Sequence, residues 1–510
     1  MQRHQVRVHP AAERLPRERQ LAWALAAFAS GTPPPDGEAL AMVPCRIVDN
    51  AAVALAALAR PPVAAARAQA LAHARRGGAS LFGLPRGIRV AAEWAAWANA
   101  TAVRELDFHD TFLGADFAHP GDNIQPLIAV SQQCGRDGRA LARAILVAYE
   151  VQVALVMAIS LHRYKKDHVA HLAPATVCGL GALLRLPTAT VYQAINQAVH
   201  LAFSTRQSRK GEISSWKAFV PGFSGKLAVE AVDRAMRGEA APSPIYEGED
   251  SVIAWMLGGP DASYEVALPG PGEAPRAILE TYTKAHSAEY QAQALIDLAV
   301  ELSARIDTAR VAEIVLETSQ HTHVVIGSGA NDPEKYDPGA SRETLDHSAP
   351  YILTVALEDG RWHHEASYAA ERRQRSSTLA LWRKIRTAES ADWNRAYHHP
   401  DPSRRAFGGR LVIRLDDGRT VTAEKRVADA HPAGARPWTW SDYAGKFESL
   451  ADGIVSKAEA RRVLGLARRL PELTAAEVRT LLPVATPRVR RALPPVAGGI
   501  FDWPSDGGVG

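Results

Sequence analysis

The sequence predicts a mainly α-helical protein built from a large all-helical domain and a smaller α+β domain. Two observations support this fold class. Apolar, alanine-rich segments of helical length fill the first half of the chain, and strand-like alternation appears only after the Pro/Gly-rich segment 268–276. With 510 residues, of which 47% are hydrophobic and 22% are charged, the chain is long enough for two or three folded domains.

The helices of the first half are predicted from their apolar faces. Trp94 and Trp97 lie three residues apart, which fits one packed helical face. Segment 222–226 (GFSGK) lacks the GxSxG spacing of a nucleophile elbow and is interpreted as the start of a helix. The segments predicted to be helical are 47–59, 90–103, 140–161, 191–203 and 226–236, with a turn at 135–138.

The most apolar stretch, 140–161, is interrupted by Arg143 and Glu150, which favours a buried bundle helix over a membrane span. The first 20 residues are polar and charged and have no apolar core, so they do not resemble a secretory signal. We therefore expect a cytoplasmic protein without a membrane partner.

The second half combines helices with strands. Segment 296–306 has a helical pattern, and segment 311–318 alternates like a strand. Segment 411–427 is predicted to form a hairpin around Asp416-Asp417-Gly418. Helical patterns return at 444–470 and 475–482. The predicted organisation is an all-helical domain (1–267), an α+β domain (277–435), C-terminal helices that rejoin the first domain (436–490) and a flexible tail (491–510).

Composition and missing motifs exclude several function classes. The net charge is only +4 and basic residues are scattered, so nothing supports a nucleic-acid partner. Cys45, Cys134 and Cys178 are far apart and match neither a zinc site nor an iron–sulfur cluster, so no metal is expected. Gly327-Ser328-Gly329 is not followed by the rest of a dinucleotide-binding motif, and there is no P-loop.

Three polar clusters are candidates for chemistry. Segment 106–120 holds three acids, two histidines and a threonine (Asp107, Asp110, Asp116, His109, His119, Thr111). Segments 163–171 and 204–217 follow apolar helices and carry further cations and histidines, among them His168, Arg206, Arg209, Lys210 and Lys217. The structural alternatives are helix capping with a satisfied core histidine for the first cluster, and charged surface for the other two. Several cations together suit a substrate with several carboxylates.

Five ordered segments resemble the MmgE/PrpD family. They are 106–123 (LDFHDTFLGADFAHPGDN), 214–235 (SSWKAFVPGFSGKLAVEAVDRA), 284–299 (KAHSAEYQAQALIDLA), 341–357 (SRETLDHSAPYILTVAL) and 427–438 (VADAHPAGARPW). The resemblance is collinear over about residues 15–470, and five motifs in the same order make a chance match improbable.

The resemblance implies an all-helical domain with an α+β lid, a homodimer, and chemistry on citrate-like acids without a cofactor. It places the catalytic residues at Asp107, Thr111, His119 and Lys217. The residues expected to bind substrate are His109, His168, Arg206, Arg209, Lys210, Lys284, His286 and Tyr351. Many family members have a histidine where this chain has Gln291, and His286 is a nearby substitute.

The implied reaction is the elimination of water from 2-methylcitrate to give 2-methyl-cis-aconitate, as in propionate catabolism, without an iron–sulfur cluster. Such a step needs a base for a carbon-bound proton and an acid for the leaving hydroxide. Asp107 or His119 is the expected base, and the other residue or Lys217 is the acid, while Lys217, Arg206 and Arg209 neutralise carboxylates. The alternatives are an enzyme that decarboxylates cis-aconitate, an epimerase, and a protein that binds a tricarboxylate without catalysis.

Overall fold

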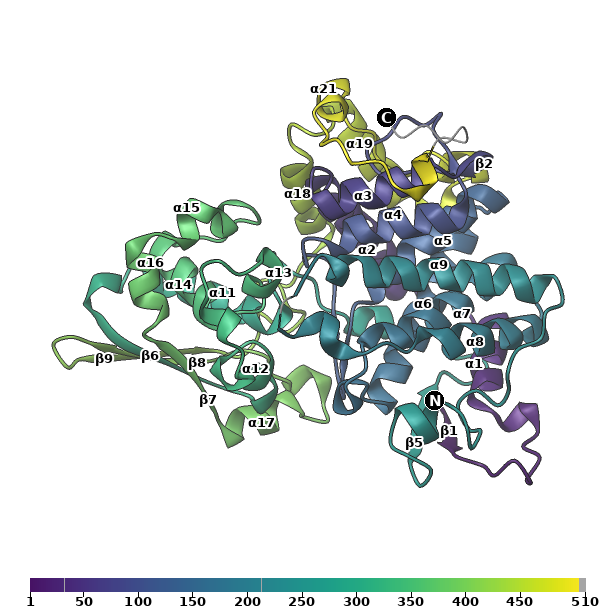
Figure 1. Ribbon diagram of the computed structural model, residues 1–510, viewed down its shortest axis with the longest axis horizontal. Coiled ribbons are helices and arrows are strands. Elements are labelled where there is room, and N and C mark those ends of the chain that lie inside the picture. The colour runs from purple at the N-terminus through teal and green to yellow at the C-terminus, as the bar shows by residue number, and fades with distance from the viewer. Residues whose placement is uncertain (32, 212, 504–510) are drawn as a thin grey trace.

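The computed structural model describes residues 1–31, 33–211 and 213–503, and it divides into a helical body and a lid (Figure 1). The helices of the body are α1 (Leu21–Ser30), α2 (Gly37–Ala56), α3 (Pro61–Leu71), α4 (Ala92–Arg104), α5 (Ile124–Cys134), α6 (Gly138–Ala158), α7 (Leu172–Leu184), α8 (Thr188–Ala202), α9 (Trp216–Met236), α10 (Val252–Met256), α18 (Trp440–Ala451), α19 (Lys457–Arg468), α20 (Ala475–Val478) and α21 (Pro487–Arg491).

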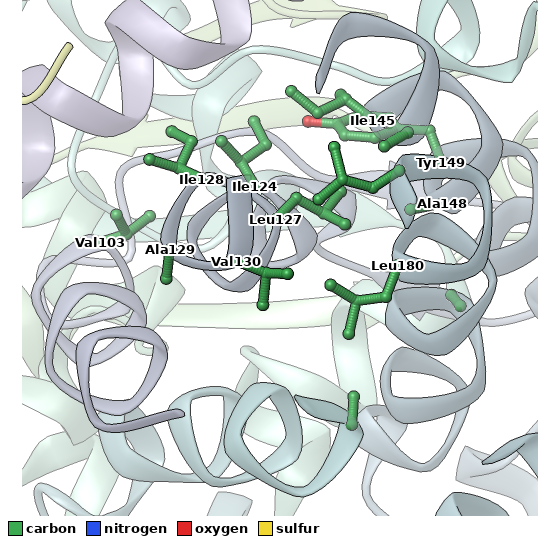
Figure 2. Close-up of a cluster of buried hydrophobic side chains, with 14 of the residues drawn as sticks. Val103, Ile124, Leu127, Ile128, Ala129, Val130, Ile145, Ala148, Tyr149 and Leu180 are labelled. Atoms are coloured by element: carbon green, nitrogen blue, oxygen red, sulfur yellow. The ribbon is translucent and has the colours of Figure 1, made fainter. Parts of the chain in front are cut away.

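Helix α5 lies at the centre of the body and is buried on nearly every side. Figure 2 shows Ile124, Leu127 and Ile128 of this helix among side chains from α4, α6 and α7. Small residues bring the surrounding helices close. A Cβ added at Gly179 of α7 would lie 3.0 Å from the Cβ of Ala148 in α6, so this contact leaves little room for a larger residue. The abundance of alanine and glycine is thus explained by tight helix packing.

Two helices, α2 and α6, are long and apolar enough to cross a membrane by length and composition. Their most apolar windows are 78% and 83% buried inside the protein. Both helices pack against other helices of the body, as core helices do.

Helix α9 begins earlier than the sequence predicted. It starts at Trp216 and contains segment 222–226 in its interior, so the interpretation of GFSGK as a helix start is wrong. Gly222 has a packing role: a Cβ there would lie 2.6 Å from the carbonyl oxygen of Trp97 in α4. This close approach joins α9 to α4, and the longer helix places Lys217 in its first turn.

The body also contains strands that the prediction of an all-helical domain missed. β1 (Gln2–Arg7) pairs antiparallel with β5 (Ser263–Leu268), and β3 (Phe112–Leu113) pairs with β4 (Phe117–Ala118); β2 (Ala74–Ala79) is a further short strand. β1 has only Val6 buried, so its polar sequence carries no apolar alternation. Its partner lies more than 250 residues away, a pairing that local pattern cannot indicate.

The lid is built on a four-stranded sheet with the order β7-β6-β8-β9. Its strands are β6 (Val311–Thr318), β7 (Ile385–Glu389), β8 (Gly409–Leu415) and β9 (Thr420–Lys425), and its helices are α11 (Gln293–Ser303), α12 (Gln320–Val325), α13 (Arg342–Leu345), α14 (Ala349–Asp359), α15 (Ala370–Arg373), α16 (Ser376–Trp382) and α17 (Ala391–Tyr397). The predicted strand at 311–318 and the hairpin at 411–427 are confirmed. α11 and α14 pack on each other and help to bury the core of the lid.

After the lid the chain returns to the body, where α18 packs against α2. Figure 1 shows these C-terminal helices beside the N-terminal ones. Part of the segment predicted as a flexible tail is packed: the ring of Phe501 lies 4.9 Å from His73 and 5.4 Å from Trp94. Residues 504–510 of that segment lie outside the described residues.

Candidate active site

A buried loop between α4 and α5 carries the first half of the site. α4 ends at Arg104, and Asp107 follows with a left-handed backbone (φ 48°), a conformation that aspartate tolerates better than most residues. The β3–β4 hairpin and a short turn then lead into α5. This path turns the Asp107 side chain into the protein, where it is 1% exposed.

Asp107 is surrounded by three cations. Its carboxylate accepts hydrogen bonds from Arg104 (2.7 Å) and Lys284, and its other oxygen lies 3.1 Å from Nζ of Lys217. Burial alone would raise the pKa of Asp107, but Arg104, Lys217 and Lys284 hold it well below its ordinary value. Asp107 is therefore a permanent carboxylate at neutral pH and a weak proton acceptor.

Lys217 connects the body to the lid. Its Nζ lies 2.8 and 3.0 Å from the two carboxylate oxygens of Asp346 and 3.2 Å from Nδ1 of His347, in addition to its contact with Asp107. The side chain of Lys217 is 3% exposed, so these pairs are shielded from water. Charge-assisted bonds of this kind are strong where the dielectric is low.

Asp107, Asp346 and His347 also have the residue types and mutual spacing of a metal site, since one ligand atom from each lies within 4.8 Å of the others. The ammonium of Lys217, however, lies within 3.2 Å of all three side chains. A cation of the protein's own thus already neutralises this donor set.

His119 is oriented by the same loop. Its Nδ1 lies 3.0 Å from the carbonyl oxygen of Asp110. Because a carbonyl can only accept, Nδ1 is the donor, and the lone pair of the neutral ring is on Nε2. Burial lowers the pKa of His119 well below 6.5, and Arg104 and Lys284 lower it further. His119 is therefore a neutral imidazole that can accept a proton.

Asp110 supports this histidine from behind the loop. One carboxylate oxygen accepts the backbone N–H of Gly121 (2.9 Å), and the other accepts the hydroxyl of Tyr149 (2.9 Å). A Cβ at Gly121 would lie 2.2 Å from the first of these oxygens, so only glycine fits the turn. The residue whose carbonyl holds His119 is thus itself held through both oxygens of its side chain.

Thr111 uses its hydroxyl within the loop itself. Oγ1 donates to the carbonyl of Ala118 (3.0 Å), and the Thr111 backbone exchanges two hydrogen bonds with Tyr282. Thr111 therefore ties the His119 loop to the segment that leads into the lid.

The predicted histidines His109 and His168 both lie next to His119. His109 is fully buried, pairs with Asp122 (2.9 Å), and has its ring 5.2 Å from that of His119. The His168 ring lies 5.4 Å from His119, and its Nδ1 is 3.0 Å from Asp167. Both rings are thus brought next to His119, each with an acid of its own.

The predicted cations of segment 204–217 are placed differently. Arg209 binds Asp167 (3.2 Å), the same acid that orients His168. Arg206 is half-buried and lies close to His162. Burial and, to a smaller extent, the charge of Arg206 lower the pKa of His162 to about 4. Lys210 is exposed. Arg209 therefore has a direct link to the site, whereas Lys210 faces solvent.

His286, Tyr351 and Gln291 are not part of the cluster around Asp107. His286 pairs with Asp297 (2.8 Å), and Tyr351 packs on Trp382 in the lid core and donates to the Ser367 carbonyl. Gln291 is buried with its amide 3.4 Å from the Tyr397 hydroxyl. Within the described residues, none of these side chains hydrogen-bonds to Asp107, Lys217 or His119.

The sequence analysis missed three members of the cluster: Arg104, Asp346 and His347. Asp346 and His347 lie in segment 341–357, which carries part of the family resemblance, but the substrate-binding residue predicted in that segment is Tyr351. Arg104 is the last residue of an apolar helix, a position at which a charged residue ordinarily has only a structural role. An acid–histidine pair just before an apolar helix was the signal that could have identified the lid residues.

Substitution of Asp346 by asparagine is expected to lower kcat by about 10- to 100-fold. The amide keeps the size of the side chain but removes the negative charge that the lid places against Lys217. The stability of a buried ion pair is lost when either partner is removed. Steady-state kinetics at several pH values measures the effect. The matched control is Asp307→Asn, which alters an exposed helix cap elsewhere in the lid. Equal rates for both variants would contradict a role for Asp346.

Comparison with known proteins agrees with this architecture. The MmgE/PrpD N-terminal domain model matches residues 19–265, and the MmgE/PrpD C-terminal domain model matches residues 286–472. The chain is 26% identical to a 2-methylcitrate dehydratase of Cupriavidus necator (74% of this chain and 75% of the relative covered) and 24% identical to one of Escherichia coli strain K12 (69% and 74%). It is 23% identical to the alkylcitrate dehydratase phiI of a fungus, strain ATCC 74256 (68% and 70%). The two domain models together span most of the chain, which therefore belongs to the MmgE/PrpD family.

Proposed function

We propose that the protein is a hydro-lyase that eliminates water from a citrate-like acid, with 2-methylcitrate as the first candidate. The observation that carries this proposal is a buried cluster in which Asp107 binds the Lys217 ammonium at the boundary between body and lid and lies close enough to the neutral His119 for their charges to interact. The lone pair of His119 is on Nε2, to which no described residue donates a hydrogen bond. The names of the relatives point to the same reaction class.

In the proposed step, Nε2 of His119 removes a proton from the carbon next to a carboxylate. The electron pair of that C–H bond forms the new C=C bond, the C–O bond breaks, and the departing hydroxide takes a proton from Lys217 and leaves as water. Asp107 is a poor candidate for the base because its pKa is held well below the ordinary value by its three cations. Both oxygens of Asp107 contact cations, whereas the neutral His119 keeps its lone pair on Nε2, and this difference favours His119 as the base.

The substrate's negative charges require cations near the reacting carbon. Arg104 and Lys284 are buried beside Asp107, and Arg209 is held by Asp167 next to His168. We assign Arg206 and Arg209 to the outer carboxylates because they lie on the same short segment. Arg209 is close to His168, and Arg206 is close to His162. Together these groups stabilise the enolate-like charge that builds up on proton removal.

The proposed chemistry does not use a metal. The donor set of Asp107, Asp346 and His347 is already neutralised by the ammonium of Lys217, which a divalent cation at that position would have to displace. A divalent cation and the Lys217 ammonium, both bound to the same buried carboxylates, would repel each other strongly.

A substrate panel tests the function. The purified protein is incubated with 2-methylcitrate, citrate and cis-aconitate, with and without a chelator, while absorbance of the new double bond and release of carbon dioxide are followed. We expect absorbance to rise with 2-methylcitrate and to be unaffected by the chelator. Carbon dioxide release from cis-aconitate would instead identify a decarboxylase, and loss of activity with chelator would overturn the metal-free proposal. Turnover of none of the acids would contradict the function.

A further inference from the structure

A lysine from the C-terminal part of the chain reaches the backbone beneath the site. Lys446 lies on α18, which belongs to the body although it follows the lid in sequence. Its side chain is buried, and Nζ donates to three acceptors: Oδ1 of Asp49 (2.6 Å), the carbonyl of Phe108 (2.6 Å) and the carbonyl of Lys284 (3.0 Å). Neither the sequence motifs nor the proposed mechanism uses this residue.

The three contacts define the charge of Lys446. All three partners are acceptors, and a lysine has three N–H donors only in its ammonium form. Asp49 on α2 supplies the counter-charge, and the Phe108 ring centroid lies 3.9 Å from Nζ, close enough for a cation–π contact. The ammonium is thus coordinated by one carboxylate and two carbonyls, with the Phe108 ring in contact and the Trp438 ring centroid 5.8 Å away.

The two carbonyls belong to the residues that carry the site. Phe108 directly follows Asp107, whose strained backbone sets the direction of the carboxylate. Lys284 directs its own Nζ to the carboxylate and carbonyl of Asp107. Lys446 therefore binds the main chains of two segments, one containing Asp107 and Phe108 and the other containing Lys284. The side chains of Asp107 and Lys284 also bind each other. One segment lies in the helical body and the other leads into the lid.

We propose that Lys446 is a positioning residue that locks the Phe108–His109 peptide to the Lys284–Ala285 peptide and so maintains the geometry of Asp107, Lys284 and Lys217. It touches no reacting atom. Its effect on turnover rests on the proposed function, whereas its effect on the two backbone segments does not. Small displacements of catalytic groups have large effects, about 100-fold in rate for roughly 1 Å.

The test is the substitution Lys446→Met, which keeps most of the length of the side chain and removes all three donors. Hydrogen–deuterium exchange of the free protein, read by mass spectrometry, is expected to accelerate in peptides covering 105–112 and 281–288 together. The control is Lys384→Met, which removes a lysine that donates to the Val311 carbonyl (2.6 Å) in the lid sheet. In the control, faster exchange is expected only around β6 and β7.

Kinetics gives the second readout. On a substrate that the wild type converts, Lys446→Met is expected to lower kcat by about 10- to 100-fold and to shift the pH profile of kcat, because the Asp107–Lys284 pair is displaced. If Lys446→Met does not fold, Lys446→Arg replaces it: the charge remains, but a planar guanidinium cannot direct three donors from one atom at the same three acceptors. That variant is expected to show the same two changes with near-native melting.

Two results would overturn the proposal. One is unchanged exchange at 105–112 and 281–288 in the folded variant. The other is a loss of activity that matches only a smaller folded fraction, with KM and the pH profile unchanged, which indicates a purely structural ion pair. If the wild type converts none of the acids, the proposed function fails, but the exchange result still decides the role of Lys446.

Discussion

Substitution of Lys217 by methionine is expected to lower kcat by roughly a thousandfold. The ammonium of Lys217 is the only group that contacts Asp107 from the body and Asp346 and His347 from the lid at once among the described residues. Its loss removes the proposed proton donor and the one cation that bridges Asp107 and Asp346 among the described residues, although Arg104 and Lys284 still bind Asp107. Removing one partner of a buried ion pair costs about 3–5 kcal/mol.

Steady-state kinetics with the substrate identified in the panel measures the effect, and circular dichroism and thermal melting report the fold. Lys226→Met is the matched control, because Lys226 lies on the same helix and pairs with Glu230 away from the site. It is expected to retain wild-type kcat within about twofold.

A double variant separates chemistry from stability. Lys217→Met with Asp346→Asn removes one charge of each sign, so the melting temperature is expected to recover part of its loss while kcat stays low. Recovery of kcat in the double variant, or near wild-type turnover in Lys217→Met, would show that Lys217 is not the acid.

Much of the fold could be predicted from local pattern. Helices such as α5 and α6 have continuous apolar faces, and β6, β8 and β9 alternate clearly, so periodicity alone locates them. α9 was placed ten residues late because Pro221 and Gly222 look like a helix boundary. Gly222 is there for contact with α4, and a tertiary contact of that kind leaves no local signal.

The site was predicted unevenly for the same reason. Asp107, His119, Lys217 and Lys284 were found through family motifs, and the structure brings Asp107 together with both lysines. Tyr351 was chosen within the right segment, but its hydroxyl is used in the lid core, and Asp346 five residues earlier faces Lys217 instead. Lys446 lies outside every motif. Its role depends on α18 returning to α2 after the lid, which only the three-dimensional arrangement reveals.

Substitution of His119 by asparagine is expected to lower kcat by about 10²- to 10⁴-fold, the range for loss of a general base, with little change in KM. The asparagine amide can still donate to the Asp110 carbonyl in place of Nδ1, so the loop is retained while the acceptor Nε2 is lost. His171→Gln is the matched control: His171 is also a buried histidine that contacts a backbone carbonyl, that of Ile159 (3.0 Å), and a glutamine amide can replace its Nε2.

The pH dependence gives this prediction its sign. Burial, Arg104 and Lys284 lower the pKa of His119 well below 6.5, so the ring stays neutral and able to accept a proton as the pH falls through 6.5. In the wild type we therefore expect kcat to stay constant down to below pH 6.5 and to fall only where the imidazole takes up a proton. In His119→Asn this acid limb should disappear, because the variant has no group there to protonate. An acid limb that persists at the same pH in the variant would assign the base to another residue, since the limb reports whichever group must be deprotonated for turnover.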